Sequence, residues 1–157
     1  MKRVLPLLLI MIFLNSCSVK EYTPTIPSAF DETATVSVGA FDFECEICRN
    51  ENVFELICLD TNAKNLKMTY DGADLMFSYT DFDYTLPAEN FERTNPVIIL
   101  YEVFALLESD GAAAVKTESG FRYTGTVAAG DFILLQSEDN SLISLEIPTL
   151  DFSISFR

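Results

Sequence analysis

The sequence predicts a mainly β (α+β) domain in which a curved antiparallel sheet packs on one main buried helix. From about residue 30 onward most of the chain alternates apolar and polar side chains, the pattern of half-buried strands. One segment, residues 96–109, is instead continuously apolar and has helix signals at both ends. The chain has 157 residues, which is enough for one domain.

The first strand region runs from about residue 33 to residue 48. Its apolar side chains stand at even-numbered positions before Gly39 and at odd-numbered positions after it. We therefore predict a β-bulge there, because an extra residue would move the following side chains to the other face of the strand. A return strand is expected over residues 53–60. The turn between them is left open: it consists of Glu51-Asn52 or is centred on Asn50-Glu51.

Asp71-Gly72 predicts a hairpin, because both central residues of a type I′ turn need positive φ. Folding the chain about this dipeptide places apolar residues on one face. The expected pairs are Tyr70 with Ala73, Met68 with Leu75, and Leu66 with Phe77.

The predicted helix begins after Asn95, a suitable N-cap, with Pro96 in the first turn. Gly111 stands where a helix stop is expected. The interior is apolar on all sides except at Glu102, which is typical of a helix that is buried or covers an apolar surface. Further strands are predicted around residues 113–117, 121–127, 131–137 and 142–156, the last broken at Pro148-Thr149.

Residues 1–16 predict an export signal rather than part of the domain. Lys2 and Arg3 precede an apolar run, Val4 to Leu14, of about eleven residues. Spanning a bilayer takes roughly 20 residues, so this run suits a leader that is removed.

Leu14-Asn15-Ser16-Cys17 resembles the lipobox of bacterial lipoprotein precursors. The resemblance implies that Cys17 receives a diacylglycerol, that the chain is cut before it, and that acyl chains hold the protein on the extracytoplasmic face of the cell membrane. We therefore expect a signal peptide over 1–16, the lipidated cysteine and a flexible tether over 17–30, and a single domain over 31–157.

The formal charge is −14, and the leader carries two of the ten basic residues but none of the 24 acidic ones. After cleavage, eight basic residues face 24 acidic ones, a formal charge of −16. Such a surface repels phosphate backbones and anionic head groups, which excludes nucleic acid as a partner and leaves the acyl chains as the expected membrane contact.

The chain has no histidine, which removes Ser-His-Asp and Cys-His catalysis and most zinc sites. Cys45-Glu46-Ile47-Cys48 is a CxxC, but in a strand its thiols point to opposite faces, which disfavours a redox or metal role. Cys45 and Cys58 stand opposite each other if the turn is Glu51-Asn52. They are then either bridged or, as we favour, free buried thiols.

Two pairs of carboxylates, Glu44 with Glu46 and Asp81 with Asp83, suggest calcium binding or glycosidase chemistry at first reading. Neither pair resembles a calcium loop, which needs acidic ligands at several fixed positions. A solvated acidic row on a strand face is the favoured interpretation. We predict no enzyme activity, no cofactor and no metal.

The apolar rows of the strands and helix suggest two readings, an ordinary filled core or a cavity between sheet and helix that holds a hydrophobic ligand. The candidate lining residues are Phe41, Phe43, Phe54, Leu56, Leu66, Met68, Leu75, Phe77, Leu100 and Phe104.

The order of elements carries a second resemblance. Hairpins, then Tyr79 to Pro87 leading into a buried helix, then Phe121-Arg122-Tyr123-Thr124-Gly125 and terminal strands over Leu150 to Phe156 are similar to small lipoproteins of Gram-positive bacteria, which in turn resemble the LolA/LolB/LppX-like superfamily. The resemblance implies a β half-barrel plugged by helix and a role in carrying lipids or lipidated partners. The alternative is a structural or interaction module of the cell envelope with a solid core and an acidic partner-binding face.

Overall fold

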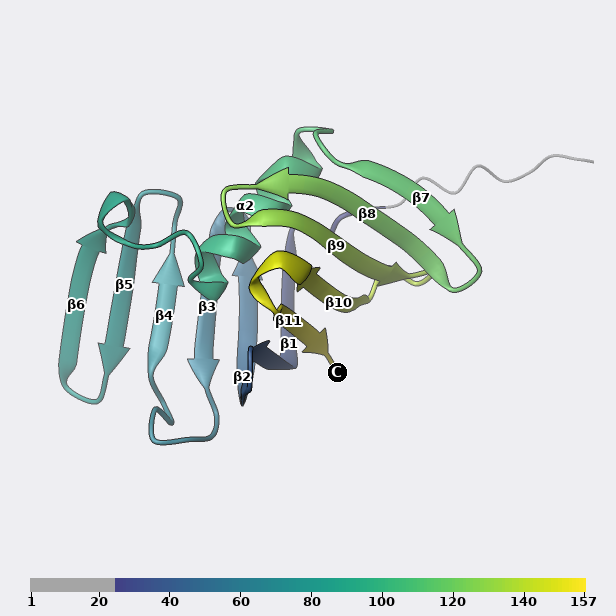
Figure 1. Ribbon diagram of the computed structural model, residues 1–157. Coiled ribbons are helices and arrows are strands. Elements are labelled where there is room, and N and C mark those ends of the chain that lie inside the picture. The colour runs from purple at the N-terminus through teal and green to yellow at the C-terminus, as the bar shows by residue number, and fades with distance from the viewer. Residues whose placement is uncertain (1–24) are drawn as a thin grey trace, which may run out of the picture.

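The computed structural model describes residues 25–157, so the expected leader, Cys17 and most of the tether lie outside the described residues. The described chain forms one open antiparallel sheet of 11 strands that curls around a single α-helix (Figure 1). The strand order is β6-β5-β4-β3-β2-β1-β11-β10-β9-β8-β7, so β6 and β7 are the edges. The predicted fold class, a mainly β half-barrel packed on one helix, is confirmed.

The elements follow in chain order. They are β1 (Ala29–Val38), β2 (Phe41–Asn50), β3 (Val53–Cys58), β4 (Lys67–Tyr70), β5 (Asp74–Tyr79), β6 (Phe82–Pro87), the 3-10 turn η1 (Ala88–Asn90), α2 (Pro96–Glu108), β7 (Ala113–Thr117), β8 (Gly120–Val127), β9 (Gly130–Ser137), β10 (Leu142–Ile147), η2 (Pro148–Leu150) and β11 (Phe152–Phe156).

A tight hairpin replaces the single long strand predicted over residues 33–48. Val38 pairs with Phe41, which leaves Gly39 and Ala40 as a two-residue turn. Gly39 has a φ of 60° and Ala40 has no positive φ, the pattern of a type II′ turn. The predicted β-bulge is therefore wrong, because a reversal of the chain, and not an extra residue, switches the side-chain parity.

The domain begins slightly earlier than the expected boundary at residue 31. β1 starts at Ala29, and the Phe30 ring lies 5.6 Å from the ring of Phe104 and 6.3 Å from that of Phe54, measured between centroids. Burial of an aromatic side chain against the core stabilises this position. Residues 29 and 30 thus belong to the sheet rather than to a flexible tether.

The β4–β5 hairpin has the predicted face but not the predicted register. Tyr70 pairs with Leu75 and Met68 with Phe77, a shift of two residues. The Asp71 carboxylate accepts hydrogen bonds from the backbone N–H groups of Ala73 and Asp74, both at 2.9 Å, and so holds a longer loop open. Because side chains alternate with a period of two, the shift leaves the same residues on the concave face.

The strands after the helix agree with the prediction, including the break at Pro148, where η2 separates β10 from β11. The last strand, β11, pairs with the first, β1, with Ala34 opposite Phe156 and Val38 opposite Phe152. This pairing joins the two arms of the sheet.

The β6 strand was not predicted; it is exposed along most of its length and lacks the half-buried pattern.

Helix α2 has the predicted ends. The Asn95 side chain accepts a hydrogen bond from the N–H of Val97 at 3.1 Å, and Pro96 occupies the first turn. At the other end Asp110, with a φ of 55°, takes the left-handed position that we expected near Gly111. The helix contacts β3, β4 and β8, so it touches both arms of the sheet.

Seven residues of α2 are buried, and they form the core with the concave sheet face. Each fully buried Leu, Ile or Phe side chain contributes roughly 1.5–3 kcal/mol. The buried set is Val97, Ile98, Ile99, Leu100, Val103, Phe104 and Leu107.

Arg49 is a charged residue within this core, 3% exposed. Its guanidinium donates hydrogen bonds to the carbonyls of Pro27 (2.6 Å) and Glu51 (2.9 Å) and pairs with the Glu108 carboxylate at 2.5 Å. It also lies 4.8 Å from the centre of the Phe104 ring. The side chain thus connects the first described residues, the β2–β3 turn and the end of α2.

Replacing Arg49 with Met should lower the free energy of unfolding by roughly 2–3 kcal/mol, because the carbonyls of Pro27 and Glu51 and the Glu108 carboxylate lose a donor that is itself buried. Denaturant unfolding of the purified protein measures the change.

The control is Arg157→Met, which breaks a solvent-exposed ion pair with Glu44 (2.8 Å). It should cost less than about 1 kcal/mol. Equal losses for the two variants would contradict the role assigned to Arg49.

Candidate functional site

Six of the ten predicted lining residues are closed off from solvent. Five of them, Phe54, Leu56, Leu75, Leu100 and Phe104, are at most 1% exposed, and Met68 is 8% exposed. They pack in one continuous core cluster between α2 and the sheet. The space directly beneath the helix at these residues is therefore filled by side chains, which favours the solid-core reading there.

The other four predicted residues remain accessible. Phe41 is 57% exposed, and Phe43, Leu66 and Phe77 are partly buried against the core. The Phe41 and Phe43 rings lie 6.0 Å apart between centroids. Figure 1 shows the start of β2, which carries both rings, at the end of the sheet away from α2. Helix α2 thus covers one part of the predicted row of lining residues and leaves the other part accessible.

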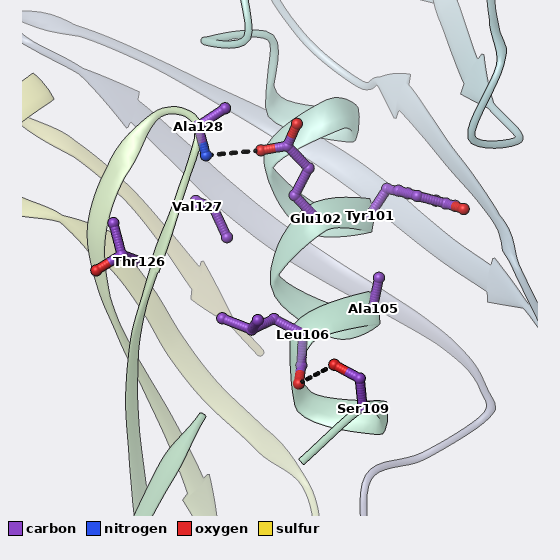
Figure 2. Close-up of a pocket in the computed structure, with 8 residues that line it drawn as sticks. All are labelled: Tyr101, Glu102, Ala105, Leu106, Ser109, Thr126, Val127 and Ala128. Carbon is purple, nitrogen blue, oxygen red and sulfur yellow. Dashed lines mark hydrogen bonds between the residues drawn. The ribbon is translucent and has the colours of Figure 1, made fainter. Parts of the chain in front are cut away.

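A groove that the sequence did not predict lies between α2 and the β8–β9 turn (Figure 2). It has a volume of about 390 Å³, is open to solvent, and is lined mainly by apolar atoms. The lining residues are Tyr101, Glu102, Ala105, Leu106, Ser109, Thr126, Val127 and Ala128.

Close packing at Gly125 holds α2 beside the β8–β9 turn. In Figure 2 the Leu106 side chain is directed toward the hairpin and Val127 toward the helix. A Cβ atom on Gly125 would lie 2.9 Å from Leu106 Cδ2 and from Phe132 Cε1. Glycine at 125 therefore lets α2 approach β8, and the groove forms where the hairpin extends past the helix.

The charged group in the groove is already engaged. The Glu102 carboxylate accepts a hydrogen bond from the N–H of Ala128 at 3.1 Å and pairs with Arg93 at 3.0 Å. These contacts fix the hairpin to the helix. They also leave an apolar surface as the part of the groove open to a ligand. The sequence signal was the all-round apolar helix, since residues that do not face the core must face something else.

Cys45 and Cys58 stand directly opposite each other, because the β2–β3 turn is Glu51-Asn52. Both are buried free thiols, and Cys48 lies on the opposite face. Burial, reinforced by the neighbouring Cys58, raises the pKa of Cys45 to about 12. Burial, followed by the hydrogen bond to the Asp31 carboxylate, raises the pKa of Cys48 to about 12. None of this favours a reactive thiolate.

Among residues 25–157, Asp31, Glu46 and Cys48 form the one group of potential metal ligands whose atoms lie within 4.8 Å of one another. The Cys48 thiol donates a hydrogen bond to the Asp31 carboxylate at 3.4 Å, so this contact accounts for their proximity without a metal. Of the two carboxylate pairs considered above, Glu44 is held by Arg157, and Asp81 and Asp83 are exposed on the β5–β6 hairpin. Glu46 is the one member of these pairs that belongs to the group around Cys48.

No protein-family model matches this sequence, and no curated protein sequence matches it significantly. A crystal structure of an uncharacterized conserved protein from Thermus thermophilus is similar to the chain, with a TM-score of 0.49 and 7% sequence identity over 82% of this chain and 76% of that one. This likeness assigns neither a family nor a function. Within the described residues, no helix combines the length and apolar character needed to cross a membrane.

We expect all three described cysteines to resist alkylation in the native protein. At pH 8 a thiol with a pKa near 12 is about 1,000-fold less ionised than one with the ordinary value of 9.0, so iodoacetamide should label Cys45 and Cys48 far more slowly than in denaturant. Burial also raises the pKa of Cys58. Mass spectrometry of each cysteine peptide gives the rates. Rapid native labelling of Cys45 or Cys48 would show that the thiols are more accessible than their burial implies.

Proposed function

We propose that the protein is an extracytoplasmic lipoprotein, anchored through acyl chains on Cys17, that binds a hydrophobic ligand in the groove between α2 and the β8–β9 turn without catalysing a reaction. The observation that carries the proposal is the apolar groove of about 390 Å³. Pockets that hold small ligands have volumes of roughly 300–1,000 Å³ and mostly apolar linings.

The charge of the protein favours a ligand without an anionic head group. The chain carries a formal charge of −14, and the Arg93 guanidinium beside the groove is already paired with Glu102. Repulsion would weaken the binding of a fatty-acid carboxylate or an acidic phospholipid. A neutral acyl chain, such as that of a monoacylglycerol or a lipidated partner, suits the groove better. Kinship with the LolA/LolB/LppX-like superfamily remains a prediction that agrees with such a ligand.

The filled core supports a second candidate, an envelope module that acts through its surface rather than through a bound lipid. Phe54, Leu56 and Phe104 leave no space at the centre of the concave face. The acidic surface is then the contact surface for a cationic partner, and binding should weaken as salt screens it.

The anchor is tested by Cys17→Ser. Without the cysteine the chain has no site for the diacylglycerol, and the negatively charged domain has no basic patch to hold it on a bilayer. The variant should therefore leave the membrane fraction of the bacterial host, as followed by fractionation and immunoblotting. Cys48→Ser is the control and should stay with the membrane. Retention of the Cys17 variant would contradict the lipid anchor.

The groove is tested by Val127→Trp, in which an indole fills the space beside Leu106. Titration with a fluorescent monoacylglycerol should show binding at least about tenfold weaker than in the parent protein. Val115→Trp is the matched control, because Val115 is 60% exposed on edge strand β7 and outside the groove.

Denaturant midpoints show whether both variants fold. If Val127→Trp does not fold, Ala128→Trp, in the same β8–β9 turn, replaces it. Unchanged affinity in a folded groove variant would remove the groove as the binding site. Oleate should bind more weakly than the neutral probe.

A further inference from the structure

The edge strand β6 (Phe82–Pro87) has a strand on one side only. It pairs with β5 over six consecutive residues, from Asp74 opposite Pro87 to Tyr79 opposite Phe82, without a bulge. No strand of the described chain covers its other side. A regular edge of this kind presents backbone N–H and C=O groups that can pair with another extended chain.

The two edges of the sheet differ in how they are protected. The β7 edge carries Lys116, a residue type that natural edges use to block pairing. The β6 edge has neither Lys nor Arg, and its one proline, Pro87, stands at the end of the strand. Strand β6 therefore has only one carboxylate, Asp83, and a terminal proline as protection, and it lacks the lysine found on β7.

The two faces of β6 present different chemistry. On the concave face Phe82 is 62% exposed and Tyr84 is 49% exposed, and their rings stack with centroids 6.2 Å apart. Tyr79, the neighbour of Phe82 on β5, is 42% exposed. On the convex face Asp83 lies opposite Ser78 and is exposed. A strand added here would meet aromatic rings with one face and a carboxylate with the other.

The stretch of chain that contains β6 is acidic, and Lys67, which shares a cross-strand row with Ser78 and Asp83, is paired with Glu55. Between Lys67 and Arg93 the sequence contains no basic residue and six acidic ones. They are Asp71, Asp74, Asp81, Asp83, Glu89 and Glu92. A basic partner segment is attracted to this edge, whereas a second copy of the chain would bring the same acidic residues to it.

We propose that β6 is a docking strand for an extended segment of a partner protein in which apolar and basic side chains alternate. The segment adds to the sheet through main-chain hydrogen bonds, its apolar side chains contact Phe82 and Tyr84, and its basic side chains face Asp83. The groove beside α2 is not involved.

The position of β6 leaves it open to such a partner. The described chain begins at Thr25, whose carbonyl accepts a hydrogen bond from Gln136 Nε2 at 3.0 Å. This contact lies on β9, on the opposite arm of the sheet from β6 (Figure 1). With the anchor that we propose at Cys17, which is the only step here that rests on the proposed function, the tether joins the domain away from the docking edge.

The test uses the purified full-length protein and a labelled peptide of about ten residues in which Leu and Lys alternate. Fluorescence anisotropy should show binding that weakens with salt, and Asp83→Lys should weaken it at least about tenfold by reversing a contact charge and protecting the edge. Glu118→Lys makes the same charge change beside β7. This control should have little effect on peptide binding. An equal loss of affinity in both variants would show that net charge alone drives the binding and would overturn the proposal.

Main-chain pairing is tested separately. Two further peptides carry N-methyl groups on alternate backbone amides, one on the amides of the Leu residues and one on those of the Lys residues, and both keep every side chain. Because successive N–H groups of a strand point to opposite edges, one of the two should bind at least about tenfold more weakly and the other about as well as the parent peptide. Equal binding of all three peptides would overturn the docking strand. If the parent protein self-associates and Asp83→Lys changes that self-association, the edge binds a second copy of the chain, and the docking-strand proposal is overturned. Val127→Trp should leave peptide binding unchanged, so failure of the lipid-binding proposal and of this one are distinguishable.

Discussion

From Pro96 to Leu107, helix α2 carries one charged side chain, Glu102, and therefore has no face suited to water. A helix of this kind must be surrounded. The sheet meets this requirement by bending, so that β3 and β4 contact the helix from one arm and β8 from the other. Most of the architecture follows from this constraint. The groove beside Leu106 is the place where the enclosure is incomplete, and its apolar lining is the part of the helix that the sheet does not reach.

The sequence predicted elements whose signals are local. Asn95, Pro96 and Pro148 mark ends that depend on the backbone of a few residues, and these ends were placed correctly. Partners distant in the chain were harder to foresee. A change of parity beside Gly39 fits a bulge and a hairpin equally well until β1 is known to pair with β2. The β6 strand was missed although its sequence carries a strand signal, since Phe82, Tyr84 and Leu86 alternate with Asp83 and Thr85.

The predicted lining residues illustrate how a shared face differs from a shared cavity. Phe41 and Phe104 were both candidate lining residues, yet Phe41 is 57% exposed and Phe104 is fully buried. Alternation along a strand determines which face a side chain occupies, but the position of α2 determines whether that face is open. The groove residues of the β8–β9 turn had no signal in their own segment. Their role depends on Gly125, which allows the helix to approach.

Pairing of the first and last strands has a consequence for how the molecule forms. Arg157 contacts Thr35 across 122 positions of the chain, and the middle of the sheet exists only when β11 has joined β1. Contacts between such distant residues slow folding, since a long loop must close before they form. During synthesis one side of β1 therefore stays unpaired until residues 152–156 have been made. A variant without β11 would have two separate half-sheets, because β11 alone joins β1 to β10 in the described sheet.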